Sequence, residues 1–535
     1  MVYRSWTSIL VRSVARTHAQ PYVSLRRPCL PCASPESSLS EQEARLKKIR
    51  DSFAEHFGQR PQHYGRSPGR VNLIGEHIDY EGYGVLPMAI GLDTVVAIRV
   101  NTSRDAITLR NTDDVKFPEL SYSTDPDQKL DTSNHTWGSY VIAAYKGVFD
   151  HLRARGYKEP KVCGLDILVD GRVPTGSGLS SSAAIVCASS LAIMAALKIG
   201  PIKKGEVAEF TAKAEQYVGV ISGGMDQAIS IMGKKDEAAL IEFNPVRATP
   251  VSIPDGTAFV VAHSLKVSNK AETSVGHYNL RVVECTIASA MLAKKLGATK
   301  EQILREYKTL KAVEGLIEAY YLEHRDAAPK DDSNWCVVAV DEYLKEGDYT
   351  TKEIESEEGL GFKVAELFAE DDEASKLVLD SFDTFKLHAR ATHVYTEKQR
   401  VYDFAQVCAD TRYSYNRTAE ILGRLMDSSH ESCDKNYDCS CPELNALVKF
   451  FKETHRAYGA RMTGAGWGGC VVALVEKMAA SLVVSNAKYA YYDKLEQVKA
   501  LEDDREAYYK LLDEAVFVSV PSQGGCLLRP FEEQD

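Results

Sequence analysis

Apolar residues recur along the chain with two different periods, and together these periods predict a mixture of helices and strands. The helical period is clear at Leu46, Ile49, Phe53 and Phe57, and Gly58 ends that run. We expect this helix to be an early element of the folded chain and to pack on the first domain.

Helix patterns and strand patterns interleave through the first half of the chain. Strand-like alternation covers residues 94–100, 106–109 and 165–169, and helix patterns cover residues 137–153 and 204–218. The first domain is therefore expected to mix strands with helices.

The second half shows the same mixture with longer helices. A strand is predicted at residues 258–262, and a helix with one apolar stripe at residues 278–296. Residues 323–382 are acidic and irregular, which is typical of solvated helices and loops. Another helix is predicted at residues 386–404, and its histidines are expected to be packed or exposed rather than catalytic.

Length and charge bound the class of protein. A chain of 535 residues exceeds one ordinary core, so two domains are expected. The net charge of −11 argues against a nucleic-acid binder or a membrane-surface binder, although a local basic pocket for phosphates is compatible with it. The longest apolar helix pattern, residues 183–197, is interrupted by serines and too short to span a membrane, so we expect a core helix.

Twelve cysteines are spread widely and lie mostly in apolar runs, which is typical of reduced, buried thiols. The closest cluster is Cys433, Cys439 and Cys441 with His430 nearby. It lacks paired CxxC spacing, so structural thiols are favoured over a zinc site.

Residues 1–35 contain five arginines, several serines and no acidic residue. This composition is typical of an organelle transit peptide, and a disordered tail is the alternative. The folded chain is expected to begin near Glu41.

A glycine- and serine-rich turn at residues 173–191 joins a predicted strand to a helix of small residues. Gly176 and Gly178 allow a ligand to approach the backbone, and Ser180, Ser181 and Ser182 could cap the helix, contact phosphate or reach magnesium. The alternative is a loop with a good N-cap. No Lys-Ser or Lys-Thr follows the glycines, so the turn is not a Walker P-loop, and it lacks the third glycine of a dinucleotide-binding turn.

A dense group of charges lies within residues 67–90, beside apolar residues that are expected to be buried. The group consists of Arg70, Glu76, His77 and Asp79. These side chains could form a surface ion-pair network, but beside buried neighbours they should converge on something polar. Their donors and acceptors suit a polyhydroxylated ligand such as a sugar.

Three further features have both a functional and a structural interpretation. Asp226 follows Gly223 and Gly224 at a predicted helix start, where the helix dipole alone would favour an acidic residue. Lys270, in the loop with Asn269, could meet a phosphate or lie at the surface. The glycine-dense residues 460–475 indicate either a cluster of tight turns or a close approach to a ligand.

Three motifs follow one another along the chain, and together they resemble those of one protein family. They are GRVNLIGEHIDY at residues 69–80, GSGLSSSAA at 176–184 and TGAGWGGC at 463–470. From about residue 42 to its end, the chain resembles the GHMP small-molecule kinases and, within them, the eukaryotic galactokinases. The resemblance implies an α+β, two-domain GHMP kinase fold with the active site between the domains.

The implied domain organisation has three parts. Residues 1–41 would be an N-terminal extension, residues 42–250 an N-terminal domain like domain 2 of ribosomal protein S5, and residues 251–535 a C-terminal GHMP kinase domain.

The resemblance also implies transfer of the γ-phosphoryl group of ATP to the anomeric hydroxyl of α-D-galactose, with Mg²⁺ as the ion. Asp226 would be the catalytic base with Arg70 beside it, and Ser182 would lie near magnesium. The implied sugar contacts are Arg70, Glu76, His77, Asp79, Asp226 and Tyr278. The implied ATP contacts are Gly176, Gly178, Ser180, Ser181, Asn269 and Lys270.

Physical chemistry constrains the implied base. A carboxylate beside an arginine is a poor base for a sugar hydroxyl, because the guanidinium stabilises the ionised form. In a loose phosphoryl-transfer transition state the nucleophile needs little early deprotonation, so proton removal should come late. Positioning and charge neutralisation should then supply most of the catalysis.

Two other functions follow from variants of the same family. The sequence His-Ile-Asp-Tyr, which contains Ile78, is also similar to that of the N-acetylgalactosamine kinases. Tyr278 instead favours galactose as the substrate. A non-catalytic galactose sensor is the alternative of another class, and such sensors lack the Ser-Ala pair that is present here as Ser182 and Ala183.

The expected partners are therefore a small sugar and ATP, without nucleic acid or membrane. The resemblance implies a monomer in the cytoplasm, and a transit-peptide function of the N-terminal extension would instead imply import into an organelle.

Overall fold

The computed structural model describes most of the chain after the N-terminal extension. The described residues are 39–131, 136–219, 223–267, 275–326, 334–454 and 456–529. Residues 1–35, for which the sequence left a transit peptide and a disordered tail as alternatives, lie outside them.

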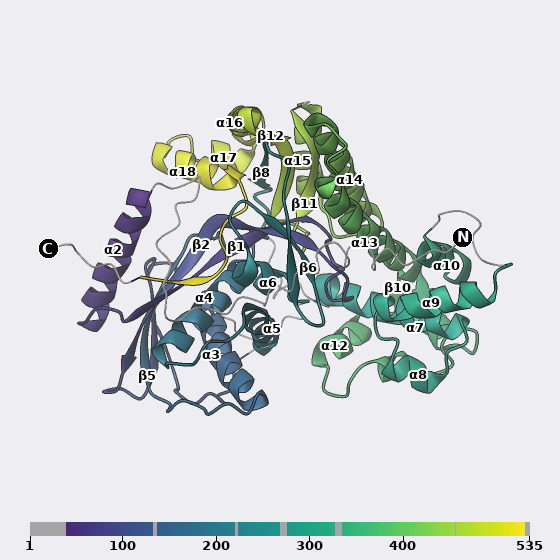
Figure 1. Ribbon diagram of the computed structural model, residues 1–535, viewed down its shortest axis with the longest axis horizontal. Helices are drawn as coiled ribbons and strands as arrows, with labels where there is room; N and C mark the ends of the chain where they lie inside the picture. Colours follow the sequence, from purple (N-terminus) through teal and green to yellow (C-terminus); the bar gives the residue numbers. More distant parts are fainter. Residues whose placement is uncertain are drawn as a thin grey trace.

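A six-stranded sheet forms the centre of the N-terminal half (Figure 1). Its strands are antiparallel except for the parallel pair β3 and β5. Their order is β14 (Cys526–Leu528), β1 (His63–Ile74), β2 (Leu86–Asn101), β5 (Gly164–Gly171), β3 (Ile107–Asn111) and β4 (Leu120–Tyr122).

Helices cover both faces of this sheet. The predicted first helix is confirmed as α2 (Leu39–Phe57), whose Leu46, Ile49 and Phe53 are buried against residues of β1, β2 and β5. On the other face α4 (Ser181–Ala196) packs on β1 and β2, and α3 (Trp137–Ala154) packs on α4. The helix α4 is buried almost throughout, as expected for a core helix.

The remaining elements of this half complete the helical layer and add a small hairpin. They are α5 (Lys204–Ala214), α6 (Met225–Met232), β6 (Ala238–Glu242) and β7 (Arg247–Val251). The hairpin of β6 and β7 contacts β2, and a bridge between Val85 and Ile241 attaches it to the segment after β1.

A four-stranded antiparallel sheet forms the centre of the C-terminal half. Its order is β11 (Ala457–Thr463), β12 (Cys470–Glu476), β8 (Thr257–His263) and β13 (Val516–Ser519). The helices that pack on it are α14 (Tyr415–Lys435), α15 (Pro442–Glu453), α16 (Ala480–Ala490) and α18 (Arg505–Ala515), and α17 (Glu496–Lys499) lies between the last two along the chain.

The rest of this half is a mainly helical region, drawn in teal to green toward the right of Figure 1. Its elements are α7 (Leu280–Lys295), α8 (Lys300–Arg305), α9 (Leu310–Glu323), α10 (Trp335–Tyr343), β9 (Tyr349–Thr350), α11 (Thr351–Glu355), α12 (Glu373–Ser381), β10 (Thr384–Phe385) and α13 (Leu387–Ala409). The apolar stripe of α7 is buried, as predicted.

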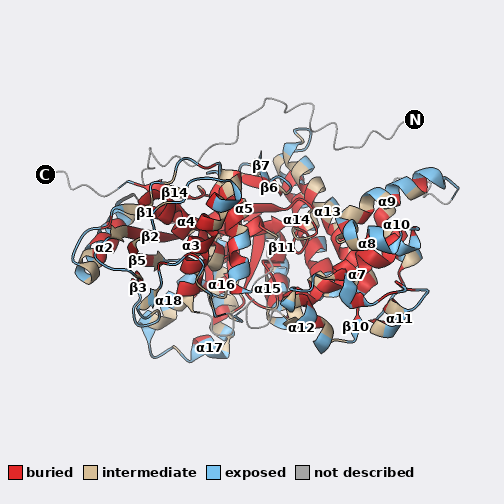
Figure 2. Cartoon of the chain, turned by 90° about the horizontal axis from the view of Figure 1, so that it is seen from below, coloured by how far each residue is buried: buried red, intermediate tan, exposed pale blue. Residues whose placement is uncertain are grey.

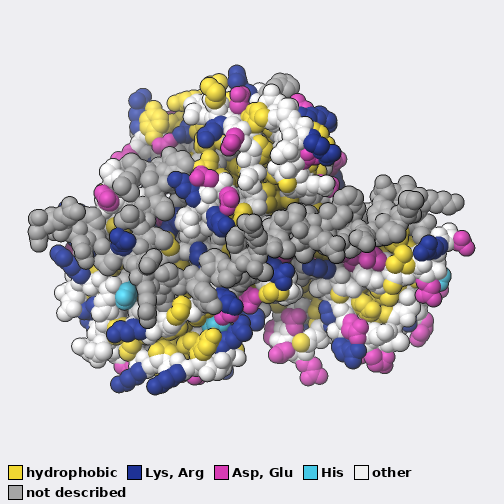
Figure 3. All heavy atoms as spheres, viewed as in Figure 1, with side chains coloured by type: hydrophobic (Ala, Val, Ile, Leu, Met, Phe, Trp, Pro, Cys, Tyr) yellow, Lys and Arg dark blue, Asp and Glu magenta, His cyan; other side chains and the backbone are white. Residues whose placement is uncertain are grey.

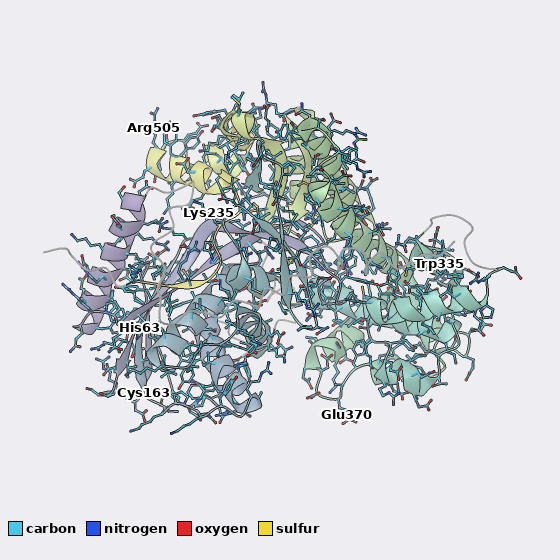
Figure 4. All side chains as sticks on the ribbon, in the orientation of Figure 1. His63, Cys163, Lys235, Trp335, Glu370 and Arg505 are labelled. Atoms are coloured by element: carbon cyan, nitrogen blue, oxygen red, sulfur yellow. The ribbon has the colours of Figure 1, made fainter. Side chains whose placement is uncertain are left out.

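The prediction that residues 323–382 form only solvated elements was wrong in part. The described acidic residues of this region are exposed or half-buried, and Figure 4 shows the labelled Glu370 at the outer edge of the helical region. Several apolar residues of the same region are buried, among them Val340, Ile354 and Val378. Charge composition dominates the sequence signal of this region and hides these inward-facing positions.

Buried residues run without a break from one half to the other (Figure 2). One hydrophobic cluster joins residues of β1 and β2 with residues of β8, β12, α7 and α13. The last strand, β14, returns to pair with β1 in the first sheet. The predicted boundary between residues 250 and 251 falls within the last two residues of β7 and remains a prediction.

A buried arginine connects the two halves. Arg461 of β11 has no exposed surface, and its Nη1 donates to the carbonyl oxygen of Asn72 at 3.1 Å and to Oε1 of Glu76 at 3.2 Å. Its Nε donates to Oγ of Ser429 in α14 at 3.1 Å, and its Nη2 lies 3.9 Å from Oε1 of Glu397 in α13.

Glu397 completes this junction. Its Oε1 accepts from the backbone nitrogen of Gly75 at 2.8 Å and from Ser429 at 2.6 Å. Burial opposes ionisation of this carboxyl, but the charges of Arg400 and Arg461 lower its pKa to about 2. The segment after β1 is thus fixed to α13 and α14 by charged hydrogen bonds.

The Arg461→Met variant is therefore expected to lose about 3–5 kcal/mol of unfolding free energy, because buried carboxylates would lose their cation. Denaturant unfolding measures the loss. Arg424→Met on the exposed face of α14 is the control and should change stability little, since the Arg424 side chain is 63% exposed. Equal midpoints for the two variants would contradict this role of Arg461.

A second buried carboxyl, Glu81, ties the loop after β1 to α9. Its Oε2 accepts from the backbone nitrogen of Leu310 at 2.6 Å, at the first residue of the helix. Burial raises the pKa of Glu81 to about 7, although the bond to Leu310 opposes this shift.

The raised pKa means that the folded protein holds this proton more tightly than the unfolded chain. The resulting stabilisation is present below the ordinary glutamate pKa and is lost as pH rises through about 7. Glu81→Gln, which stays neutral, should become more stable than the natural protein by up to roughly 3 kcal/mol as pH rises from about 5 to about 8. Thermal melts across this range measure the difference, and a constant difference would contradict the prediction.

Candidate active site

An ion pair between Arg70 and Asp226 lies where β1, α6 and the glycine turn meet. Nε of Arg70 donates to Oδ1 of Asp226 at 2.7 Å, and Nη1 donates to the carbonyl oxygen of Gly178 at 2.6 Å. The Arg70 side chain is 1% exposed and that of Asp226 is 8% exposed. One guanidinium therefore fixes the predicted base against the predicted phosphate-binding turn.

Asp79 lies beside the start of α6. Its Oδ2 accepts weakly from the backbone nitrogen of Met225 at 3.5 Å. A Cβ atom added to Gly223 would lie 2.3 Å from the same oxygen, so only glycine lets the two segments approach this closely. The acidic groups of Asp79 and Asp226 are thus brought to the same end of α6.

Tyr278 faces this acidic group from a single π-helical turn, Val275–Asn279, that precedes α7. Burial raises the pKa of Tyr278 well above its ordinary value, and the nearby Asp79 and Asp226 raise it further. The hydroxyl therefore keeps its proton. The tyrosine ring centroid lies 5.3 Å from that of His77. Isolated π-helical turns are frequent at functional sites.

His77 and Glu76 connect this group to the glycine loop between β11 and β12. Nε2 of His77 lies 2.9 Å from the carbonyl oxygen of Ala465, and Nδ1 lies 3.1 Å from the hydroxyl of Tyr80. Oε1 of Glu76 accepts from the backbone nitrogen of Gly464 at 2.7 Å. Both residues have structural partners besides any sugar that they would contact.

Carbonyl groups of the glycine turn accept hydrogen bonds from Arg70 of β1 and from within the turn itself. The carbonyl of Pro174 accepts from Oγ of Ser177 at 2.7 Å, and that of Leu179 accepts from the backbone nitrogen of Arg70 at 3.0 Å. The carbonyl of Gly178 accepts from the Arg70 side chain. Because C=O and N–H point in opposite directions in a trans peptide, the next N–H in each case points away from these donors. Successive outward amides form an anion-binding concavity.

The start of α4, which follows the glycine turn, is also suited to bind an anion. Ser180, the N-cap, is left-handed with φ 60°, and no side-chain bond caps the helix. Among the described residues, the buried Oγ of Ser180 has no hydrogen-bond partner. An unsatisfied buried hydroxyl is costly, and a phosphate oxygen at this helix N-terminus would satisfy it. Ser181 and Ser182 follow on the first turn and are half-buried.

The glycine loop at residues 463–470 packs directly on this turn. A Cβ atom added to Gly464 would lie 2.7 Å from the carbonyl oxygen of Gly178, and one added to Gly469 would lie 2.8 Å from that of Ser177. Gly466 approaches the Cys439 carbonyl in the same way. The sequence left open whether these glycines approach a ligand or form tight turns, and the structure shows that they approach neighbouring backbone.

Two further groups of residues were singled out in the sequence. Asn269 and Lys270 lie outside the described residues. Cys433 and Cys439 are buried beside the site, where Sγ of Cys439 contacts the carbonyl oxygen of Cys433 at 3.4 Å. No group of three His, Cys, Asp or Glu within the described part of the chain is arranged to hold a metal ion.

Sequence reasoning missed three residues of the site: Tyr80, Tyr437 and Arg461. Tyr80 is the last residue of the first motif, but the pattern gave it no role. Tyr437 and Arg461 lie far along the chain from the residues that they contact, so spacing carries no signal for them.

The face of the molecule in Figure 3 carries charged side chains of both signs. Lys, Arg, Asp and Glu side chains are interspersed on the face in Figure 3, with acidic groups gathered over the region of α8 and α12. Within the described residues, no helix has both the length and the apolar character that a membrane span requires.

Comparison with known proteins places this chain in a family. The galactokinase galactose-binding signature matches residues 51–100, the GHMP kinases N terminal domain matches residues 139–234, and the GHMP kinases C terminal model matches residues 412–493.

Similar proteins match along nearly the whole chain. Galactokinase from Dictyostelium discoideum is 36% identical over 92% of this chain and 95% of its own length. Galactokinase from Saccharomyces cerevisiae is 34% identical over 89% of this chain and 93% of its own.

A solved structure agrees on the fold. The crystal structure of Lactococcus lactis galactokinase complexed with galactose superposes with a TM-score of 0.58 at 22% identity, covering 90% of this chain and 99% of that one. The predicted α+β GHMP kinase fold is confirmed. The chain belongs to the galactokinase family of the GHMP kinases.

Proposed function

We propose that this protein phosphorylates α-D-galactose at its anomeric hydroxyl with ATP as the donor, giving galactose 1-phosphate and ADP. The observation that carries the proposal is the Arg70 side chain, which donates to Asp226 and to the Gly178 carbonyl at once. This arrangement sets a proton acceptor beside a turn suited to phosphate. The curated relatives named galactokinase support the choice of sugar.

The proposed sugar contacts surround Asp226. Asp79 and Asp226 supply acceptors for hydroxyl groups, and Arg70 and Tyr278 supply donors. Glu76 and His77 complete the set that the motif predicts. The proximity of Asp79, Asp226 and Tyr278 supports a common ligand for these side chains.

The proposed ATP site is the turn and the start of α4. Outward amides around Gly176 and Gly178 and the hydroxyls of Ser180 and Ser181 would bind phosphate oxygens. Oγ of Ser180, which has no hydrogen-bond partner in the part of the chain that the structure describes, supports this assignment. Asn269 and Lys270 remain predicted nucleotide contacts.

Mg²⁺ fits the residues of this region. It prefers oxygen ligands and keeps several waters, so a kinase needs few protein ligands for it besides the substrate phosphates. Ser182, half-buried on the first turn of α4, would supply a hydroxyl oxygen. When bound, the ion would neutralise charge on the transferring phosphoryl group.

Asp226 would act late in the reaction. Its Oδ1 already accepts from Arg70, which stabilises the carboxylate and makes it a weak base before the phosphoryl group moves. As the new P–O bond forms, the sugar hydroxyl becomes more acidic and its proton can pass to Asp226. Before that step the carboxylate orients the hydroxyl, and Arg70 balances the local negative charge.

ADP release with galactose and with N-acetylgalactosamine, each at varied concentration, tests the proposal. We expect turnover with galactose and a kcat/KM at least about tenfold lower with N-acetylgalactosamine. The reverse preference would indicate an N-acetylgalactosamine kinase, and sugar binding without ADP release would indicate a sensor.

The monomeric state and the cytoplasmic location remain predictions. Sedimentation of the full chain tests the first, and imaging of the tagged full chain tests the second.

The Asp226→Asn variant is expected to fold and to lose at least about a hundredfold in kcat, because the amide cannot accept the proton. Asp255→Asn is the control, since Asp255 lies on an exposed turn. Thermal melts verify folding and ADP release measures turnover. Near-normal kcat in Asp226→Asn would reject Asp226 as the base.

A further inference from the structure

Four side chains form a continuous hydrogen-bonded row that ends at His77, and we refer to them as the tyrosine row. The hydroxyls of Tyr80 and Tyr437 lie 2.5 Å apart, and the Tyr437 hydroxyl lies 3.2 Å from Sγ of Cys285. The Tyr80 hydroxyl reaches Nδ1 of His77 at 3.1 Å. The row thus runs from α7 through the segment after α14 to the loop after β1.

The contact on the far side of His77 selects the tautomer of the neutral ring. The carbonyl oxygen of Ala465 can only accept, so Nε2 of His77 must carry a proton to make its 2.9 Å bond. In the neutral ring Nδ1 is then an acceptor and Tyr80 must donate to it. Tyr80 in turn accepts from Tyr437, and Tyr437 accepts from the thiol of Cys285.

Burial keeps these donors protonated. It raises the pKa of Tyr80 and of Tyr437 well above the ordinary tyrosine value, and it does the same for the Cys285 thiol. Tyr80, Tyr437 and Cys285 therefore each have a proton to donate at neutral pH.

The loop that carries Tyr437 is rigidly supported. Oε2 of Glu284 accepts from both Arg281 and Arg390 at 2.7 Å. Arg281 also donates to the Tyr437 carbonyl at 2.8 Å, and Arg390 donates to the Asn436 carbonyl at 2.6 Å. These side chains are almost fully buried, so the Tyr437 backbone is fixed from α7 and α13 together.

The rings around His77 leave it little freedom to rotate. Its centroid lies 4.9 Å from that of Tyr437, 5.3 Å from that of Tyr278 and 5.7 Å from that of Trp467. Packing thus limits the position of the ring, whereas the hydrogen bonds at its two nitrogens select its orientation and tautomer.

We propose that Tyr437 is a positioning residue for sugar binding, which acts through Tyr80 to set the orientation and tautomer of His77. The proposal rests on the proposed function, in which His77 belongs to the sugar site. Because His77 also bonds to Ala465 of the glycine loop, Tyr437 would fix the sugar side of the site relative to the loop that packs on the phosphate turn.

Tyr437→Phe removes one hydroxyl and little volume. We expect KM for galactose to rise about three- to tenfold, with KM for ATP within about twofold of the natural protein and kcat changed less than KM. Tyr145→Phe is the matched control, since Tyr145 is also buried and its hydroxyl donates to a backbone carbonyl in the core under the first sheet, at 2.7 Å.

The tautomer of His77 gives an independent readout. In protein labelled with ¹⁵N-histidine, with the His77 signals assigned by their loss in His77→Gln, the ring should show a protonated Nε2 and an unprotonated Nδ1. Tyr80→Phe removes the donor to Nδ1 and should populate a second ring state. Cys285→Ser keeps a donor at the end of the row and should resemble the natural protein, whereas Cys285→Ala should shift KM in the direction of Tyr437→Phe.

The outcomes separate this inference from the function on which it rests. No galactose-dependent ADP release by the natural protein would overturn the proposed function. An active natural protein whose Tyr437→Phe and Tyr80→Phe variants keep the same KM for galactose and the same His77 spectrum would overturn the inference alone. An equal rise of KM for galactose and for ATP would also overturn it, because that result indicates general loosening of the structure.

Discussion

The buried guanidinium of Arg461 is the constraint on which the site depends. It lies on β11 of the second sheet, yet it bonds to Asn72 and Glu76 at the end of β1 in the first. A buried arginine is stable only with its carboxylates and carbonyls in place, so β1 cannot move away from β11, α13 and α14 without losing several charged bonds. The residues that precede and follow Asn72 therefore occupy fixed positions between the two sheets.

The proposed sugar side and the proposed phosphate side of the site share structural supports. Arg70 joins Asp226 to Gly178, and the glycine loop joins His77 and Glu76 to the same turn. Each support is a short polar bond or a contact between backbones that leaves no room for a side chain. Transfer between two small molecules requires their reacting atoms to be held in register, and such direct connections provide that rigidity.

Much of the fold and the site could be predicted from local sequence. The helix α2, the core helix α4 and the stripe of α7 follow from periodicity, and the glycine turn marks the start of α4. Asp226 at the start of α6 was also anticipated. The buried positions of residues 323–382 were missed because charge masks the apolar residues there, and the return of β14 to the first sheet has no local signal.

The sequence by itself determined the elements, the family and the residue types that a sugar kinase needs, because these depend on short motifs. The tertiary structure alone decided how the motifs meet. Gly464 and Gly469 are glycines because backbone of the phosphate turn lies against them, and Tyr437 contacts Tyr80 only because two distant segments fold together. Arg70 and the glycine loop therefore fix the orientation of the glycine turn. Buried carbonyl groups need hydrogen-bond donors, and here distant segments of the chain supply them.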